Sequence, residues 1–407
     1  TQNTTAKITS QHGLIYTELI ETKGTEKAQQ YAQANEAAIA EYRRIIEREQ
    51  IDCEVEEQSA YLYGKNAEVL KQEAEAAAAF GIPAVFLEHC PLPHSKSHAV
   101  RFDRQAQFHP LKFLHALAEQ LTIYEQTPVQ TVEDYTLHTP EGTVQAEHII
   151  FATHYPFVNF PGLYFARMHQ ERSYVLALEN APALDGMYIG DGNTPYSFRS
   201  YQKYLLFGGE GHRTGENQQG GCYEALRKKA KKLFPDAREV AHWSAQDCMP
   251  ADHVPYIGEY TLTKANWYVA TGFQKWGMTS SMVAAMLLRD RICKKENPFA
   301  EVFDPQRFSM EEASGIAYES KHAIKTLTKR FFEVPEATAA EIPAGHGGIV
   351  MIDGEKIGDF DAASNIIKID MDIEYEIASV DSMKIIKKEY GYKFNRNTGI
   401  KRYVDRI

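Results

Sequence analysis

The stretch Gly272-Phe-Gln-Lys-Trp-Gly-Met-Thr-Ser-Ser281 is the part of this 407-residue sequence that decides the expected fold. It follows a short apolar run, Trp267 to Ala270, and leads into apolar residues at helical spacing from Met282 onward. A glycine-containing turn between a strand and a helix lets backbone N–H groups and the positive helix end approach a negatively charged ligand. Residues 279–281 carry hydroxyl groups and are predicted to cap the helix. The two glycines therefore predict either such a ligand site or only a tight turn.

Strands and helices alternate on the N-terminal side of this turn. Helices are expected at residues 25–50, 67–80, 110–120, 223–233 and 282–292. Strands are expected at residues 122–124, 129–132, 135–138, 143–146, 148–153, 173–178, 187–190, 204–208 and 267–270. The run His148 to Thr153 is apolar on both faces, as a buried parallel strand is. The pattern predicts a mixed α/β fold, α+β in part, whose core carries an antiparallel sheet.

Composition and charge exclude several classes of protein. The 44 Lys and Arg residues against 55 Asp and Glu residues give a net charge of −11, which argues against a nucleic-acid binder. No apolar run approaches the roughly 18 residues that a membrane helix needs. The five cysteines form no C-x-x-C pair, so the sequence predicts a reducing, cytoplasmic compartment without a disulfide framework.

A few polar residues are candidates for chemistry on residue type alone. Arg199, just before a predicted strand, is expected either to grip a substrate carboxylate or to form a structural salt bridge. Lys275 and His12 are single polar residues in otherwise informative runs, where a structural role is the usual one.

Motifs for hydrolysis and for metal binding are weak or absent. The sequence contains neither G-x-S-x-G nor H-E-x-x-H, which lowers the expectation of a serine or zinc hydrolase. Cys90, His94 and His98 have ligand-like spacing, but their proline-rich surroundings favour a surface loop, and no metal site is predicted.

The C-terminal region differs in texture. Residues 341–357 predict two strands joined at Asp353-Gly354, residues 367–377 alternate apolar and charged side chains as one half-exposed strand does, and residues 392–404 predict a hairpin. The expected organisation is a main domain over residues 1–308, a helical linker over 309–340 and a β-rich module over 341–407. That module reads either as a small structural unit or as an edge that binds a partner protein.

Five strings occurring in order make the sequence similar to a known family. They are Asn3-Thr-Thr-Ala-Lys-Ile-Thr-Ser-Gln-His-Gly13, Gln105-Ala-Gln-Phe-His-Pro-Leu111, Phe151-Ala-Thr-His-Tyr-Pro-Phe157, the run from Asp247 to Gly258, and Gly272-Phe-Gln-Lys-Trp-Gly-Met278. Together they resemble the FAD-dependent oxidoreductases of the D-amino-acid oxidase/glycine oxidase superfamily, most of all a bacterial subgroup with a C-terminal Rieske domain. The resemblance runs from Thr1 to about Phe308.

The resemblance implies an FAD-binding α/β domain interleaved with a substrate domain that has a large antiparallel sheet. The implied activity is oxidation of an amine or amino acid by hydride transfer to the flavin, with oxygen, a quinone or another protein as the final electron acceptor. The cofactor-binding residues implied are Thr4, Thr5, Ala6, Lys7, Val129, Ala152, Thr153, Gly272, Trp276, Gly277 and Met278. The catalytic residues implied are Arg199, Lys275 and Thr279.

The sequence departs from the family pattern at both ends. The family's Gly-x-Gly-x-x-Gly motif is expected before Thr1 and occurs nowhere in the 407 residues, so the chain alone is expected to bind FAD weakly. No cysteine follows Cys293, so the two Cys ligands of a Rieske iron–sulfur cluster are missing and no cluster is expected. The alternative to an impaired oxidoreductase is a non-catalytic scaffold that binds a protein through its C-terminal strands.

Overall fold

The computed structural model describes residues 3–93, 95–158, 160–193, 195–216 and 220–307, and short strands after residue 349. The chain divides into two compact units, residues 1–214 with 222–323 and residues 215–221 with 324–407. Within the described ranges, no helix is both long enough and apolar enough to cross a bilayer.

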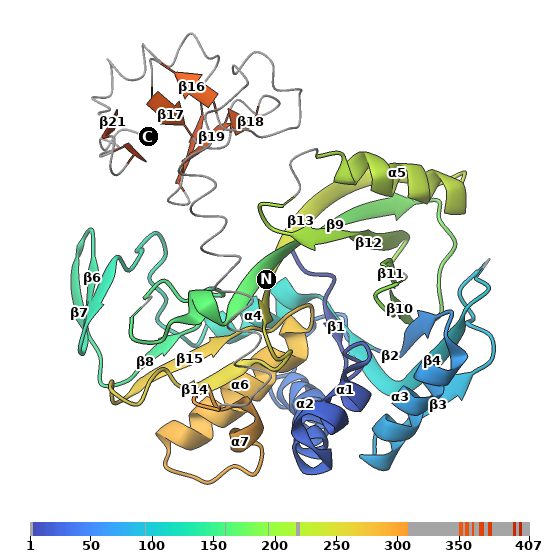
Figure 1. The fold of residues 1–407 in the computed structure, drawn as a ribbon, viewed down its shortest axis with the longest axis horizontal. Helices are drawn as coiled ribbons and strands as arrows, with labels where there is room; N and C mark the ends of the chain where they lie inside the picture. The colour runs from blue at the N-terminus through green and yellow to red at the C-terminus, as the bar shows by residue number, and fades with distance from the viewer. Residues whose placement is uncertain are drawn as a thin grey trace. The chain divides into compact units, whose positions relative to one another are not determined.

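A curled nine-stranded sheet forms the centre of the first unit (Figure 1). Its strands are β1 (Lys7–Ile8), β2 (Glu56–Gly64), β3 (Ala84–Leu87), β4 (His98–Gln107), β9 (Met168–Glu179), β10 (Met187–Gly190), β11 (Ser197–Tyr201), β12 (Tyr204–Arg213) and β13 (Arg238–Pro250). The order is β1-β4-β2-β10-β11-β12-β9-β13, with β3 paired to β4. All pairs are antiparallel except β2 with β10. The sheet is thus mainly antiparallel, as expected.

Two smaller sheets lie beside it. The first has the order β14 (Tyr256–Glu259), β15 (Trp267–Thr271), β8 (Ile149–Phe151), and β15 pairs with β8 in parallel. The second is the meander β5 (Thr131–Glu133), β6 (Thr136–Thr139), β7 (Gly142–Gln145). A 3-10 turn, η1 (Tyr164–Ala166), precedes β9. The expected strand at residues 122–124 is wrong, because this exposed segment has no regular structure.

The helices cover both faces of the main sheet (Figure 1). They are α1 (Ile15–Lys23), α2 (Thr25–Arg48), α3 (Ala67–Ala79), α4 (Pro110–Ala118), α5 (Cys222–Leu233), α6 (Gly277–Ile292) and α7 (Ala300–Phe303). Buried side chains of α1, α2, α3 and α6 share the largest apolar core with β2, β4 and β15. Leu226 and Ala230 of α5 belong to a second core formed with the opposite face of β9 to β12. This arrangement confirms the mixed α/β fold.

The second unit is described only through short strands. β16 (Val350–Ile352) and β17 (Glu355–Ile357) pair antiparallel, and the turn predicted at Asp353-Gly354 lies outside the described residues. β19 (Ile366–Ile369) pairs antiparallel with β20 (Ile373–Glu376) and with β18 (Phe360–Asp361). The single strand predicted over residues 367–377 is therefore wrong, since its two halves pair with each other. β21 (Phe394–Asn395) and β22 (Gly399–Ile400) form the expected hairpin.

Candidate functional site

The carboxyl ends of the parallel strands β8 and β15 mark the place where the candidate residues gather. Ala152 and Thr153 follow β8 and are exposed, while Gly272 follows β15. The Thr271 hydroxyl donates to the His154 carbonyl and so ties the two strand ends together. In sheets with parallel strands, ligands bind in the crevice outside these carboxyl ends.

The segment after β15, residues 272–279, is called the amide turn. Gly272 has φ +75°, and a Cβ there would lie 2.5 Å from the Pro250 ring, so only glycine fits. The Gln274 N–H donates to the Cys248 carbonyl at 3.0 Å. These contacts place the amide turn against the end of β13.

The first turn of α6 has backbone donors that no side chain caps. The helix begins at Gly277, and Trp276 in the cap position makes no capping hydrogen bond. The Thr279 hydroxyl donates instead to the Thr9 carbonyl at 3.0 Å. The prediction that residues 279–281 cap this helix is therefore wrong. The first N–H groups of a helix need acceptors from outside it, and an anionic ligand supplies them well.

Residues 4–12, called the entry segment, lie directly against the amide turn. The His12 ring stacks on the Trp276 indole with centroids 4.8 Å apart and an interplanar angle of 15°. The hydrogen bond from Thr279 to Thr9 joins the same two stretches. The two segments expected to hold one ligand are thus neighbours, although more than 250 residues separate them in sequence.

The start of the entry segment has a constrained backbone. Ala6 is 1 % exposed and left-handed, with φ 50°, and its N–H donates to Thr4 Oγ1 at 2.9 Å. Thr5 is half-buried, and Lys7 begins β1. Burial and the neighbouring Arg199 lower the pKa of Lys7 to about 7, and its Nζ donates to the Tyr188 carbonyl at 3.3 Å.

Arg199 anchors this backbone. Its guanidinium donates to the carbonyls of Thr5 and Ala6, to Gln107 Oε1 at 2.9 Å and to the Phe108 carbonyl at 3.1 Å, and the residue is 3 % exposed. The structure does not present the guanidinium to a ligand, so the predicted carboxylate clamp gains no support from this geometry. Arg199 instead holds the entry segment in place through the backbone carbonyls of Thr5 and Ala6.

Lys275 forms a partly exposed ion cluster with Glu171, Asp247 and Ser173, here called the open cluster. Its Nζ lies 3.1 Å from the carboxylates of both Glu171 and Asp247 and 3.2 Å from Ser173 Oγ. Glu171 and Asp247 are direct partners across the β9–β13 ladder, and Ser173 follows two residues later on the same face. The Lys275 side chain is 34 % exposed, so water and small molecules reach the cluster.

Charges in the open cluster are well defined at neutral pH. A hydrogen bond from His169, opposed by burial and assisted by Lys275, lowers the pKa of Glu171 to about 2. Burial disfavours the Lys275 ammonium, but Asp247 and Glu171 outweigh this effect and raise the pKa of Lys275. Two carboxylates therefore face one ammonium, and the cluster attracts cations as well as hydrogen-bond acceptors.

The remaining predicted residues are unevenly placed. Met278 is half-buried, and its carbonyl accepts a hydrogen bond from Tyr42 of α2 at 2.9 Å. Val129 lies before β5, and among the described residues no hydrogen bond or ion pair joins it to the other candidates. Glu171 and Ser173 were missed by the sequence prediction, since only the alternation of β9 places them on one face.

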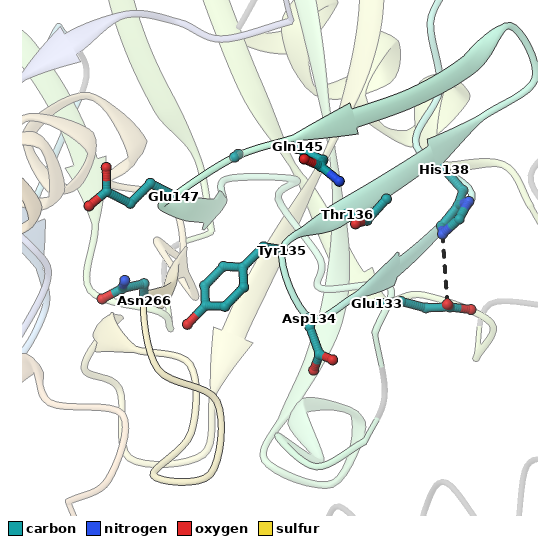
Figure 2. Close-up of a pocket in the computed structure, with 9 residues that line it drawn as sticks. Glu133, Asp134, Tyr135, Thr136, His138, Gln145, Glu147 and Asn266 are labelled. Carbon is teal, nitrogen blue, oxygen red and sulfur yellow. Dashed lines mark ion pairs between the residues drawn. The ribbon is translucent and has the colours of Figure 1, made fainter.

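A separate cleft of about 900 Å³ lies at the meander and contains none of the predicted residues. Figure 2 shows Glu133, Asp134, Tyr135 and Glu147 along its walls, with His138 in an ion pair with Glu133. For metals, the described ranges contain no group of three ligand-type side chains, and His94 lies outside the described residues.

Comparison with known proteins adds family and fold. The family model "FAD dependent oxidoreductase" matches residues 2–291. The chain is 38 % identical over 384 residues to YhfW of Bacillus subtilis (strain 168), which is named a Rieske 2Fe-2S iron-sulfur protein, covering 88 % of this chain and 74 % of that protein.

Solved structures share the fold at low identity. Glycine oxidase from Geobacillus kaustophilus has a TM-score of 0.60 and 19 % identity, covering 75 % of this chain and 88 % of that one. L-proline dehydrogenase from P. horikoshii also has a TM-score of 0.60, with 16 % identity, covering 69 % of this chain and 83 % of that one.

Proposed function

The chain belongs to the FAD dependent oxidoreductase family, and from this premise we propose that it oxidises an amine or an amino acid by hydride transfer to FAD. The observation that carries the proposal is the contact between the entry segment and the uncapped first turn of α6. It lies at the carboxyl ends of β8 and β15, where a flat ligand reaches the backbone donors of the first turn of α6.

The residues present fit a flavin. FAD, when bound, supplies the hydride acceptor, and its ring gains negative charge on reduction. The free N–H groups of Gly277 and Met278 and the positive end of α6 favour that charge. Gly272 lets the backbone pass close to β13 without a side chain in the way. Thr4, Thr5 and Ala6 belong to the entry segment, on the other side of the proposed flavin site.

The open cluster fits the substrate side. Glu171 and Asp247 accept hydrogen bonds from an amine, while Lys275 donates to a carboxylate or another acceptor on the same substrate. Lys275 adjoins Trp276 in sequence, so the cluster borders the proposed flavin site. Relatives in the fold include a glycine oxidase and a proline dehydrogenase, whose names refer to amino-acid substrates.

The first experiment measures FAD binding by the purified 407-residue chain through quenching of flavin fluorescence. Met278→Pro removes one N–H from the first turn, where proline is tolerated, and is expected to weaken binding about tenfold. Met278→Ala is the matched control, because it shortens the side chain but keeps the N–H, and its affinity is expected to equal that of the wild type.

The second step adds amines and amino acids to the FAD-loaded chain without oxygen and follows bleaching of the flavin absorbance. Bleaching by at least one such compound supports the proposal. If the wild-type chain bound no FAD at any concentration, the proposal would fail and the scaffold alternative would stand. Weak but saturable binding agrees with the low affinity proposed for this chain.

A further inference from the structure

His12 joins the two halves of the candidate site, because this residue of the entry segment contacts both Trp276 and Thr279 of the amide turn. Its Nδ1 lies 2.7 Å from the Tyr31 hydroxyl, and its Nε2 lies 2.8 Å from the Thr9 carbonyl and 3.1 Å from Thr279 Oγ1. Its ring stacks on Trp276. With an exposed fraction of 5 %, the imidazole is enclosed between α2, the entry segment and α6.

The partners fix the tautomer of this imidazole. A carbonyl only accepts, so Nε2 carries the proton that it donates to Thr9, with Thr279 Oγ1 as a second acceptor. Nδ1 then has no proton and accepts from the Tyr31 hydroxyl. The Thr279 hydroxyl in turn donates to the Thr9 carbonyl at 3.0 Å, with the Trp276 carbonyl at 3.4 Å as a more distant acceptor.

The ring is also held in its neutral form. Burial lowers the pKa of His12 to about 3, despite the opposing hydrogen bond to Thr9. The other titratable groups facing it are Tyr31, whose pKa burial raises, and Tyr16 beyond it, whose pKa is also raised by burial. The His12 ring that stacks on Trp276 is therefore uncharged across the neutral range.

These contacts of His12 affect the N-terminus of α6. α6 begins at Gly277, so Thr279 lies inside its first turn, where its hydroxyl joins the helix to Thr9 and His12. No side chain caps α6 at Trp276, and the first-turn N–H groups stay available. We propose that His12 is a positioning residue that holds the entry segment against α6. It thereby sets the distance between the entry segment and the first turn of α6, and the position of the helix dipole, in the flavin site. This inference rests on the proposed function. His12 acts through Trp276 and Thr279, and we assign it no contact with the substrate.

The test compares His12→Phe and His12→Gln in the full chain. Phenylalanine keeps the stacking but loses the hydrogen-bond contacts with Tyr31, Thr9 and Thr279, whereas glutamine keeps an N–H donor but loses the ring. Both variants are expected to bind FAD about tenfold more weakly, because the entry segment is then held less firmly against α6. The midpoint potential of the bound flavin is expected to fall, because a displaced helix end stabilises the reduced form less.

Tyr42→Phe is the matched control. It removes a hydrogen bond from α2 to the same turn of α6, at Met278, but leaves the entry segment untouched. Its midpoint potential is expected to equal that of the wild type. A purely structural role for His12 would lower stability to urea in both His12 variants without changing the potential, and that result would overturn the inference.

The two levels of the proposal fail differently. A wild-type chain that binds no FAD removes the proposed function and this inference together. A wild-type chain that binds FAD, with unchanged affinity and potential in both His12 variants, removes only the inference. If His12→Phe does not fold, His12→Gln carries the comparison. In the flavin-free chain, nitrogen NMR of His12 is expected to show the Nε2–H tautomer without titration between about pH 5 and pH 8, and titration near pH 6.5 would contradict the preset network.

Discussion

Two ion clusters in the first unit are built from similar residues but differ in how fully the protein surrounds them. In the buried cluster, Asp252 pairs with Lys23 at 2.8 Å and with Arg307 at 2.8 Å, and the exposed fractions of the three side chains are 1 %, 6 % and 9 %. In the open cluster, Lys275 is 34 % exposed between Glu171 and Asp247. Burial, not residue type, separates a structural cluster from one that can meet a ligand.

The position of each cluster supports this difference. Arg307 also donates to the carbonyls of Val254 and Pro255, so the buried cluster ties α1, the segment after β13 and the chain after α7 into one body. The open cluster lies next to the amide turn and leaves polar atoms accessible. A buried charge without its partner is costly, whereas a half-exposed one is solvated.

The largest expected effect comes from breaking the buried cluster. Asp252→Asn leaves Lys23 and Arg307 buried without a counter-charge, and the free energy of unfolding is expected to fall by about 3–5 kcal/mol. Asp247→Asn, the same substitution in the open cluster, is expected to lower it by less than about 1 kcal/mol. Urea unfolding measures both, and equal losses in the two variants would remove the distinction between the clusters.

The second effect is a loss of activity, and it is expected from the open cluster instead of the buried cluster. Lys275→Gln is expected to lower kcat/KM for the best amine or amino-acid substrate about 100-fold, equivalent to about 2.7 kcal/mol, because the substrate loses a charged hydrogen bond. Its unfolding free energy is expected to change little. Steady-state kinetics of the FAD-loaded chain check this.

Glu259→Gln serves as the control for that experiment. It removes the partner of Arg291 in a surface pair at 2.7 Å whose side chains are 58 % and 38 % exposed. Kinetic constants equal to those of the wild type are expected. A loss in Glu259→Gln as large as in Lys275→Gln would show that general surface charge, and not the open cluster, controls the reaction.

Apolar periodicity predicted α2 to α6 and several strands of the first unit. The sequence analysis did not predict α1, α7 or the strands β1 to β4, β11, β13 and β14. The helix at 25–48 buries Tyr31, Ala38 and Tyr42 on one face, as its spacing indicates. The strand expected at 122–124 failed because β-prone residues there have no neighbouring strand to pair with and stay exposed. The capping of α6 failed for a tertiary reason, since Thr279 finds Thr9 across the fold.

The site was predictable only where one short segment carries it. Residues 272–279 are contiguous, so their strand-turn-helix pattern is visible in the sequence. The open cluster is not, because Glu171 and Asp247 become neighbours only through the β9–β13 register. Arg199 shows the opposite error, a predicted site residue for which the structure gives no support. A lone arginine suggests a carboxylate clamp, but its acceptors include the carbonyls of Ala6 and Phe108, which are distant in sequence.

The smallest expected effect is the pH dependence of stability, to which Asp252 contributes in acid and Lys275 at alkaline pH. Burial disfavours the ionised Asp252, but Arg307 and Lys23 outweigh it and hold the pKa of Asp252 well below its usual range. A depressed pKa in the folded state means that the stabilisation is present above the unfolded pKa, about 3.9, and is lost as pH falls toward the folded value. Lys275 has a raised pKa, so its contribution is present below about pH 10.4 and is lost at higher pH.

Urea unfolding at pH 3 to 5 therefore tests the Asp252 contribution. Below about pH 4 this contribution to the unfolding free energy is expected to decline by up to about 1.4 kcal/mol per pH unit. Asp252→Asn lacks this group, so its unfolding free energy is expected to fall less steeply than that of the wild type. Lys275→Gln loses the decline at alkaline pH and, because Lys275 helps to lower the pKa of Glu171, a smaller part of the acid slope. An acid slope unchanged by Asp252→Asn would mean that the proton is taken up elsewhere, and the buried cluster would then contribute no more to the acid limit of the fold than the open cluster does.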